Sequence, residues 1–350
     1  MQKSLNKFQS RQCCSVYNSD NNKIFFSLVD YRNNYFTSDD PNRIIEFYNG
    51  FENRDQLIQW MRERPKGVAT INEVEGEKDV IVVIPTADFK GKYAIECREN
   101  IFKDLHIVFV ESGGREDFYF NIAHNFNVGI RKAMEYNPKW VVYSGDDMYK
   151  IDDAEVITKQ LETINNKQVD VIYSIPSYGY HSTPVKFIFP NRAGMFIYTH
   201  RMFKDQSSYV ASLVKELKLN LIFTPIDTSN RDSPKVTIKE WIKINILTKF
   251  LFHHTRIRFI QLGAFGIISR NFVLKTGGDV FDENFINSCE DMELSYRILK
   301  EERPNAKIRY NIKPMVGTTL GNNANRDLRG IAGRFYLYSI ISRDLNVHGK

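Results

Sequence analysis

The chain has 350 residues, of which 42% are hydrophobic and 26% charged, a composition typical of a globular protein with a substantial core. The formal net charge of +6 permits anionic substrates or a membrane surface, but it is too small to indicate a dedicated nucleic-acid binder. The four cysteines have neither CxxC nor Cys/His spacing, so we expect no zinc site and infer no disulfide pairing.

The first 75 residues are rich in Asn, Asp and Ser, and they show no motif with recognisable chemistry. A helix is predicted over 53–64, because Pro65-Lys66-Gly67 follows and ends it. The charged stretch 73–78 contains a glycine and predicts a linker. We therefore predict that residues 1–75 form an accessory segment, a small N-terminal appendage to the next domain.

From residue 79 onward, apolar runs alternate with amphipathic segments. The run 79–85 contains five consecutive β-branched residues, Val80 to Ile84, as expected of a strand buried on both faces of a parallel sheet. The same reasoning predicts further strands and helices, namely strands at 105–110, 140–143 and 169–175 and helices at 92–102, around 122–134 and at 154–164. This alternation predicts an open, mostly parallel α/β sheet flanked by helices, with ligands at the carboxyl ends of its strands.

Polar residues follow three of the predicted strands. Thr86 comes directly after Pro85, Glu111 ends the second strand, and Asp146-Asp147 follow the strand 140–143. Paired carboxylates suit a hard cation such as Mg²⁺ or Mn²⁺, which leaves coordination places for substrate phosphates. The alternatives are ordinary ones: a helix N-cap for the Asp pair, a solvated strand end for Glu111, and a β-turn for Thr86.

The second half of the chain is less regular. Helices are predicted over 208–217, 239–252, 290–300 and 326–344, the last weakened by Gly330 and Gly333, and an extended segment over 219–224. The segment 238–252 is basic and amphipathic, so it either packs its apolar face on the core or lies on an anionic membrane. No charged n-region with an apolar h-region opens the sequence, and no uncharged apolar run reaches about 18 residues, so we expect neither export nor a membrane span. The expected location is the cytoplasm, with a peripheral contact at the inner face of the membrane as a second expectation.

Six short motifs occur along the chain. They are Pro85-Thr86 after an apolar strand, Glu111-Ser112-Gly113-Gly114, Asn127-Val128-Gly129-Ile130-Arg131-Lys132-Ala133, Ser144-Gly145-Asp146-Asp147, Gly277-Gly278 with Phe281-Asp282-Glu283, and Glu290-Asp291 with Leu294 and Arg297. In this order they resemble the family 2 glycosyltransferases, enzymes of the GT-A fold that use nucleotide-sugar donors. The resemblance covers about 79–300. It implies a catalytic domain over 76–310, with a nucleotide-binding half at 76–175 and an acceptor half at 176–310, followed by a C-terminal helical region at 311–350.

The resemblance implies a metal-dependent, inverting glycosyltransferase that moves a sugar from a nucleoside-diphosphate donor to a hydroxyl of a glycan, lipid-linked or protein acceptor. Nucleic acid is not an expected partner. The implied roles fall on seven residues: Asp147 as ligand of Mg²⁺ or Mn²⁺, Asp146 on the ribose or the metal, Pro85, Thr86 and Glu111 at the nucleoside, Asp291 as general base, and Glu290 orienting the acceptor. Stabilisation of the helix N-terminus is the alternative role for the last two.

The sequence departs from the family pattern at three points. Ser144 stands where the longer metal motif has its first Asp, Asp279 and Val280 are extra residues, and Phe126 stands where an Arg often precedes the helix Asn. A sugar-phosphate nucleotidyltransferase and a catalytically silent sugar- or nucleotide-binding module remain as alternatives. The former needs a Gly-rich basic loop after the first strand, and residues 86–91 contain a single glycine.

Overall fold

The computed structural model of the chain describes residues 31–114, 117–150, 152–174, 265–301, 303–308 and 312–314, together with 328–333, 335–337, 339, 340 and 343. The elements predicted at 208–217, 219–224 and 239–252, and with them the basic amphipathic segment, lie outside these residues. Among the residues described, no helix combines the length and the apolar character needed to cross a membrane.

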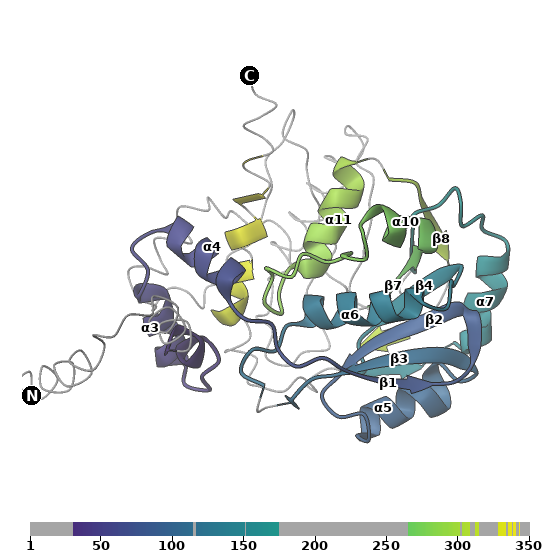
Figure 1. The fold of residues 1–350 in the computed structure, drawn as a ribbon, viewed down its shortest axis with the longest axis horizontal. Coiled ribbons are helices and arrows are strands. Elements are labelled where there is room, and N and C mark those ends of the chain that lie inside the picture. Colours follow the sequence, from purple (N-terminus) through teal and green to yellow (C-terminus); the bar gives the residue numbers. More distant parts are fainter. Residues whose placement is uncertain are drawn as a thin grey trace, which may run out of the picture.

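A seven-stranded sheet lies at the centre of the described structure (Figure 1). In spatial order its strands are β1 (Thr70–Val74), β3 (Leu105–Glu111), β2 (Glu77–Thr86), β4 (Trp140–Ser144), β7 (Phe265–Ser269), β6 (Val171–Ser174) and β8 (Asn305–Ile308). Strands β1 and β7 run opposite to the other five. The predicted open, mostly parallel sheet flanked by helices is therefore confirmed. Strands β5 (Met148–Lys150) and β9 (Ile312–Pro314) form a separate pair.

Helices cover both faces of this sheet and produce three layers. Because strand residues alternate, Val80, Val82 and Ile84 face one layer, made of α5 (Lys92–Glu96), a π-helix (Cys97–Ile101) and α7 (Ala154–Glu162). Ile81 and Val83 face the other layer, made of α6 (Ile122–Met134), α10 (Arg270–Lys275) and α11 (Glu290–Lys300). The central strand β2 is thus buried on both sides, as its β-branched run predicts.

The N-terminal helices share a third core with distant parts of the chain. The buried aromatic residues of α3 (Pro41–Asn49) and α4 (Arg54–Glu63) pack with residues between 285 and 337. The Tyr48 hydroxyl donates to the Leu328 carbonyl at 2.6 Å, and both are buried. The described residues from 328 to 343 are helical, as predicted. Gly333 permits this packing, because a Cβ there would lie 2.3 Å from the Ser288 carbonyl oxygen.

Two local predictions need correction. The linker predicted at 73–78 is wrong: β1 extends to Val74 and β2 begins at Glu77, so the chain turns in two residues and both sides join the sheet. Apolar Ile71 and Val74, paired with Val110 and Ile107 of β3, explain why the charged stretch is a strand end. The helix predicted at 92–102 is α-helical only to Glu96 and then widens into the π-helix.

Gly129 brings α6 into close contact with the sheet. A Cβ at this position would lie 2.4 Å from Val83 Cγ1 and 2.8 Å from Val110 Cγ2, both on fully buried, β-branched side chains. We expect Gly129→Ala to lower the free energy of unfolding by about 1–3 kcal/mol, the usual effect of overpacking a core. Urea unfolding measures this loss of stability. Adding Val83→Ala should restore room, so the double variant should lose less than the sum of both single losses. Additive losses would contradict this account.

Candidate functional site

The ends of β2, β3 and β4 bring three of the sequence-predicted residues together. Thr86 and Glu111 end adjacent parallel strands and are opposite each other in register. Asp146 lies two residues beyond β4, and its Oδ2 accepts a hydrogen bond of 2.7 Å from Thr86 Oγ1. Pro85, which has no amide hydrogen to donate, lies beyond Val83, where the ladder to β4 ends. Pro85 is buried, so it shapes the strand end from within.

Asp146 is held from two directions. Thr86 binds its carboxylate, and the Cys97 thiol at the start of the π-helix donates to its backbone carbonyl at 3.3 Å. Burial is the main cause that raises the pKa of Asp146 to about 6, the negative charge of Asp147 adds to it, and the Thr86 bond opposes it. Two adjacent carboxylates, one of them poorly solvated, form a site that favours a bound cation or proton.

The Asp146-Asp147 pair fits the ligand set of a hard divalent ion. Asp147 Oδ1 lies 3.0 Å from the position that a Cβ on Gly145 would take, so the glycine gives this carboxylate space. In the part of the chain that the structure describes, no cluster of three or more His, Cys, Asp or Glu side chains could hold a metal. Mg²⁺ commonly uses only one or two carboxylates and completes its shell with water and substrate phosphates. Ser144 is fully buried, and its hydroxyl donates to the Gly145 carbonyl, so this hydroxyl is already used within the protein.

The stability of the protein should depend on the charge of Asp146. Its pKa of about 6 in the folded protein exceeds the ordinary value of 3.8, so the folded protein binds this proton more tightly than the unfolded chain does. The resulting contribution to stability is fully present below about pH 4, and it is lost as the pH rises to above 6. Asp146→Asn keeps an acceptor for Thr86 without the charge. We expect it to raise the free energy of unfolding at pH 7.5, by at most about 3 kcal/mol, and to change it little at pH 3.

Urea unfolding in the presence of a chelator measures this difference. Asp55→Asn, at an exposed position, is the control and should show no comparable change with pH. A lower stability of Asp146→Asn at pH 7.5 would contradict the assignment of a destabilising buried charge.

Glu111 binds the loop that follows β2. Its Oε1 accepts from the Phe89 amide at 3.0 Å, and its Oε2 accepts from Asn72 Nδ2 at 3.1 Å. Each carboxylate oxygen has a further lone pair, so Glu111 keeps the capacity to accept a hydrogen bond from a ligand. The interactions show a second role that the sequence did not reveal, since Glu111 fixes the loop beside Thr86.

Glu290 and Asp291 begin α11, as predicted. Neither takes part in the Thr86–Asp146 bond or in the bonds of Glu111 to Phe89 and Asn72. Asp291 Oδ1 accepts from the Met292 amide at 2.8 Å, a local bond at the helix start. Just before them, Asn287 and Cys289 have φ angles of 54° and 71°. A left-handed backbone conformation is unusual for a cysteine, and such conformations concentrate at functional sites. The two angles set the direction in which the chain enters α11, and so they help to place these two carboxylates.

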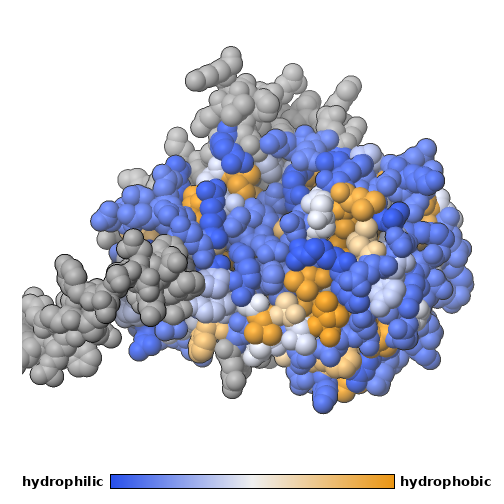
Figure 2. Space-filling model, viewed as in Figure 1, coloured by the Kyte–Doolittle hydropathy of each residue, from blue (hydrophilic) through white to orange (hydrophobic). Residues whose placement is uncertain are grey.

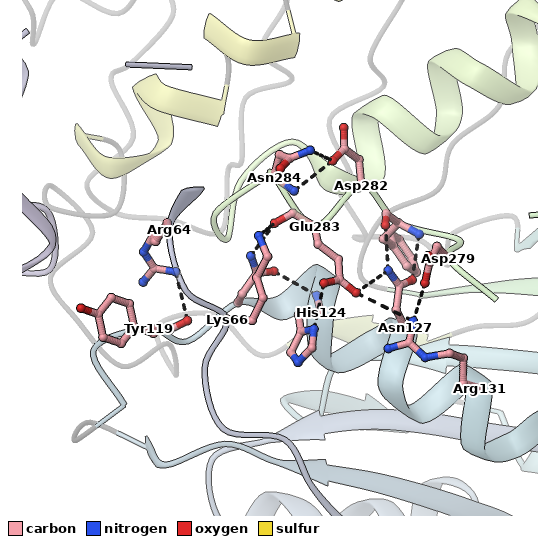
Figure 3. A network of polar contacts seen from close by, with 12 residues as sticks. Arg64, Lys66, Tyr119, His124, Asn127, Arg131, Asp279, Asp282, Glu283 and Asn284 are labelled. Atoms are coloured by element: carbon pink, nitrogen blue, oxygen red, sulfur yellow. Dashed lines mark hydrogen bonds and ion pairs between the residues drawn. The ribbon is translucent and has the colours of Figure 1, made fainter. Parts of the chain in front are cut away.

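A polar network around Glu283 explains several of the other motif residues (Figure 3). Asn127 binds the Phe281 backbone in both directions, with Nδ2 donating to its carbonyl at 2.8 Å and Oδ1 accepting from its amide at 2.9 Å. Asn127 also donates to Glu283, whose other oxygen lies 2.9 Å from His124 Nδ1. These contacts fasten the Gly-Gly and Phe-Asp-Glu stretch to α6. The two extra residues are also accounted for, since Asp279 pairs with Arg131 and the Val280 carbonyl accepts from Arg297.

An open cavity of about 670 Å³ lies over this network. Its lining is polar and combines cations and carboxylates, namely Lys66, Arg131, Asp279, Phe281, Asp282, Glu283, Asn284, Glu293 and Arg297. None of the predicted site residues is among them. Glu293 lines the cavity, and Asp291, two positions earlier on the same helix, faces another direction. The face of the molecule drawn in Figure 2 is mostly hydrophilic, with several smaller hydrophobic patches.

The sequence was also compared with known proteins. No family model matches it, and no curated protein matches it at a significant level.

Proposed function

We propose that this protein is a metal-dependent glycosyltransferase with a GT-A-like catalytic domain. It would transfer a sugar from a nucleoside-diphosphate donor to an acceptor hydroxyl with inversion of configuration. The observation that carries the proposal is the Asp146-Asp147 pair at the carboxyl edge of the parallel strands, with Asp146 bound to Thr86 and its pKa raised to about 6. Ligands of open α/β sheets bind at this edge.

The donor side of the proposed site uses the two aspartates and the neighbouring strand ends. A divalent ion on Asp147 and Asp146 would neutralise charge on the diphosphate as it leaves. Thr86 orients Asp146, and Cys97 holds the backbone of the same residue. Glu111 and the rigid loop that it fixes form the nucleoside side.

The acceptor side uses the start of α11. Asp291 is the general base that removes the proton from the acceptor hydroxyl while its oxygen attacks the anomeric carbon. Because the oxygen attacks opposite the departing nucleotide, a single displacement inverts the configuration. Glu290 orients the acceptor, which we expect to be a glycan, a lipid-linked sugar or a protein side chain. Negative charge at both positions interacts favourably with the dipole at the N-terminus of α11.

The geometry of the loop after β2 argues against the nucleotidyltransferase alternative. A triphosphate needs backbone amides that are free to donate. In residues 88–91 all four amides already donate within the protein: Asp88 to Thr86 Oγ1, Phe89 to Glu111, Lys90 to Asp88 Oδ1 and Gly91 to the Asp88 carbonyl. One observation favours a silent binding module. Ser144 stands where the longer metal motif has its first Asp, and it is fully buried, so the motif has one carboxylate ligand fewer.

Turnover of labelled nucleotide-sugars separates these functions. A glycosyltransferase releases the nucleoside diphosphate, transfers the sugar to an acceptor or to water, and stops when a chelator is added. A nucleotidyltransferase would instead release pyrophosphate from a nucleoside triphosphate and a sugar phosphate. Binding of a donor without transfer or hydrolysis, over a broad panel of acceptors, would support the silent module.

A further inference from the structure

Residues 64–68 connect α4 to β1 and lie between two loops that are distant in sequence (Figure 3). One loop, of which the structure describes 112–114 and 117–121, follows Glu111 at the end of β3 and is called loop 112–121 below. The other, 281–289, precedes Glu290 at the start of α11. The segment 64–68, called the strap below, therefore lies between the donor side and the acceptor side of the proposed site.

Arg64 holds the first loop through its buried guanidinium, and the residue is 3% exposed. Its Nη1 donates to the Tyr119 carbonyl at 3.0 Å, its Nη2 to the Phe118 carbonyl at 2.8 Å, and its Nε to Asn33 Oδ1 at 2.7 Å. Burial lowers the pKa of Arg64 to about 10, so the side chain is still charged at neutral pH. The guanidinium of an arginine holds five N–H donors in a fixed planar fork, which fits this spread of acceptors better than the compact ammonium of a lysine.

Asp117 adds contacts between the same loop and the strap. Its Oδ2 accepts from the Val68 amide at 2.9 Å, and its Oδ1 accepts from the Tyr119 amide at 3.0 Å. A Cβ on Gly67 would lie 2.3 Å from Asp117 Oδ2, so only a glycine allows this approach. The loop is thus held along its C-terminal half by Arg64 and Val68, at the two ends of the strap.

Lys66 extends the strap to the second loop. Its Nζ donates to the Glu283 carbonyl at 2.5 Å, and Asn121 Nδ2 donates to the same carbonyl at 2.8 Å. The Ile122 amide donates to Asn287 Oδ1 at 2.9 Å. The two loops and the strap therefore form one hydrogen-bonded unit, and the N-terminal end of the first loop reaches the donor side, where the Ser112 amide donates to the Thr86 carbonyl.

We propose that the strap positions the two loops against each other, with Arg64 as a positioning residue for the nucleotide side and Lys66 as one for the side of the general base. This inference rests on the proposed function, and it gives the N-terminal appendage a part in the reaction. In this proposal Arg64 and Lys66 act without touching a substrate. Their effect passes through loops 112–121 and 281–289.

Hydrogen exchange and kinetics of Arg64→Gln, Arg64→Lys and Lys66→Met test the proposal. We expect Arg64→Gln to speed amide exchange in loop 112–121 about 10-fold or more and to raise the donor KM about 10-fold, with kcat within about 3-fold, because misplaced binding groups weaken a pre-formed site. Arg64→Lys should bring both the loop exchange rate and the donor KM part of the way back to the values of the parent protein. Lys66→Met should speed amide exchange in loop 281–289. This variant tests the proposal independently if Arg64→Gln does not fold.

Leu57→Val is the matched control, because Leu57 is fully buried in α4 and belongs to the core of the N-terminal helices. It should lower stability without changing loop exchange or the donor KM. Unchanged loop exchange in the strap variants, or an equal rise in KM in Leu57→Val, would overturn the proposal. If the parent protein turns over no nucleotide-sugar, the proposed function fails, and the exchange data still decide whether the strap orders the loops.

Discussion

Asp147→Ala should abolish sugar transfer and, with it, metal-dependent binding of the nucleoside diphosphate. Asp147 and Asp146 are the paired carboxylates at the edge where the donor diphosphate would lie, and no third acidic, His or Cys ligand accompanies them in the described residues. A lost cation removes several kcal/mol of charge stabilisation from the leaving group, which corresponds to a fall in kcat/KM of about 10³-fold or more. Steady-state kinetics and calorimetric titration with Mn²⁺ measure the two effects.

The control for Asp147→Ala is Asp55→Asn, at an exposed position in the first turn of α4. The Asp55 carboxylate lies 3.5 Å from Arg54 Nε, a surface ion pair of the kind that contributes little to stability. The control should keep transfer and metal dependence. Full activity of Asp147→Ala, or an equal loss in both variants, would contradict the metal assignment.

Asp291→Asn should also abolish transfer, but it should leave nucleotide binding unchanged. The amide cannot accept the acceptor proton, and loss of a general base lowers kcat by about 10²–10⁴-fold. Since Asp291 does not belong to the Thr86–Asp146 group, the metal-dependent affinity for the nucleoside diphosphate should equal that of the parent. This contrast with Asp147→Ala separates the acceptor side from the donor side.

A carboxylate in the first turn of a helix also stabilises that helix, so a structural effect must be separated from a catalytic one. Asp55 occupies the first turn of α4, far from the motifs in sequence, and Asp55→Asn measures the structural effect alone. Each substitution should lower the free energy of unfolding by about 1 kcal/mol or less. If Asp291→Asn kept full activity, or lost it only in proportion to unfolding, Asp291 would be a helix-capping residue.

Much of the layered fold could be predicted from the sequence, because its signals are local. The β-branched run of β2 and the four-residue apolar spacing of α6 follow directly from burial on two faces and on one stripe. The helix start at Asn53 is also local, since its side chain accepts from the Gln56 amide. The polar ends of β2, β3 and β4 could be placed at one edge because parallel strands share their direction.

Other features depend on contacts between distant segments and could not be predicted. Strand β1 pairs with β3 rather than with its neighbour β2, and its charged end concealed the apolar Ile71 and Val74. The roles of Asn127 and Glu283 depend on a loop about 155 residues away along the chain. Arg64 ends the helix predicted over 53–64, and only the folded protein shows that its guanidinium is buried against loop 112–121.

The central claim is a metal-dependent nucleotide site at the carboxyl edge of β2, β3 and β4, and calorimetric titration of UDP and GDP into the parent protein tests it most directly. The account predicts that one of them binds in the presence of Mn²⁺, and that a chelator or Asp147→Ala weakens the binding at least about 10-fold, or roughly 1.4 kcal/mol. Binding that is unchanged by the chelator and by the substitution, or the absence of binding by any nucleoside diphosphate with Mn²⁺ present, would contradict it.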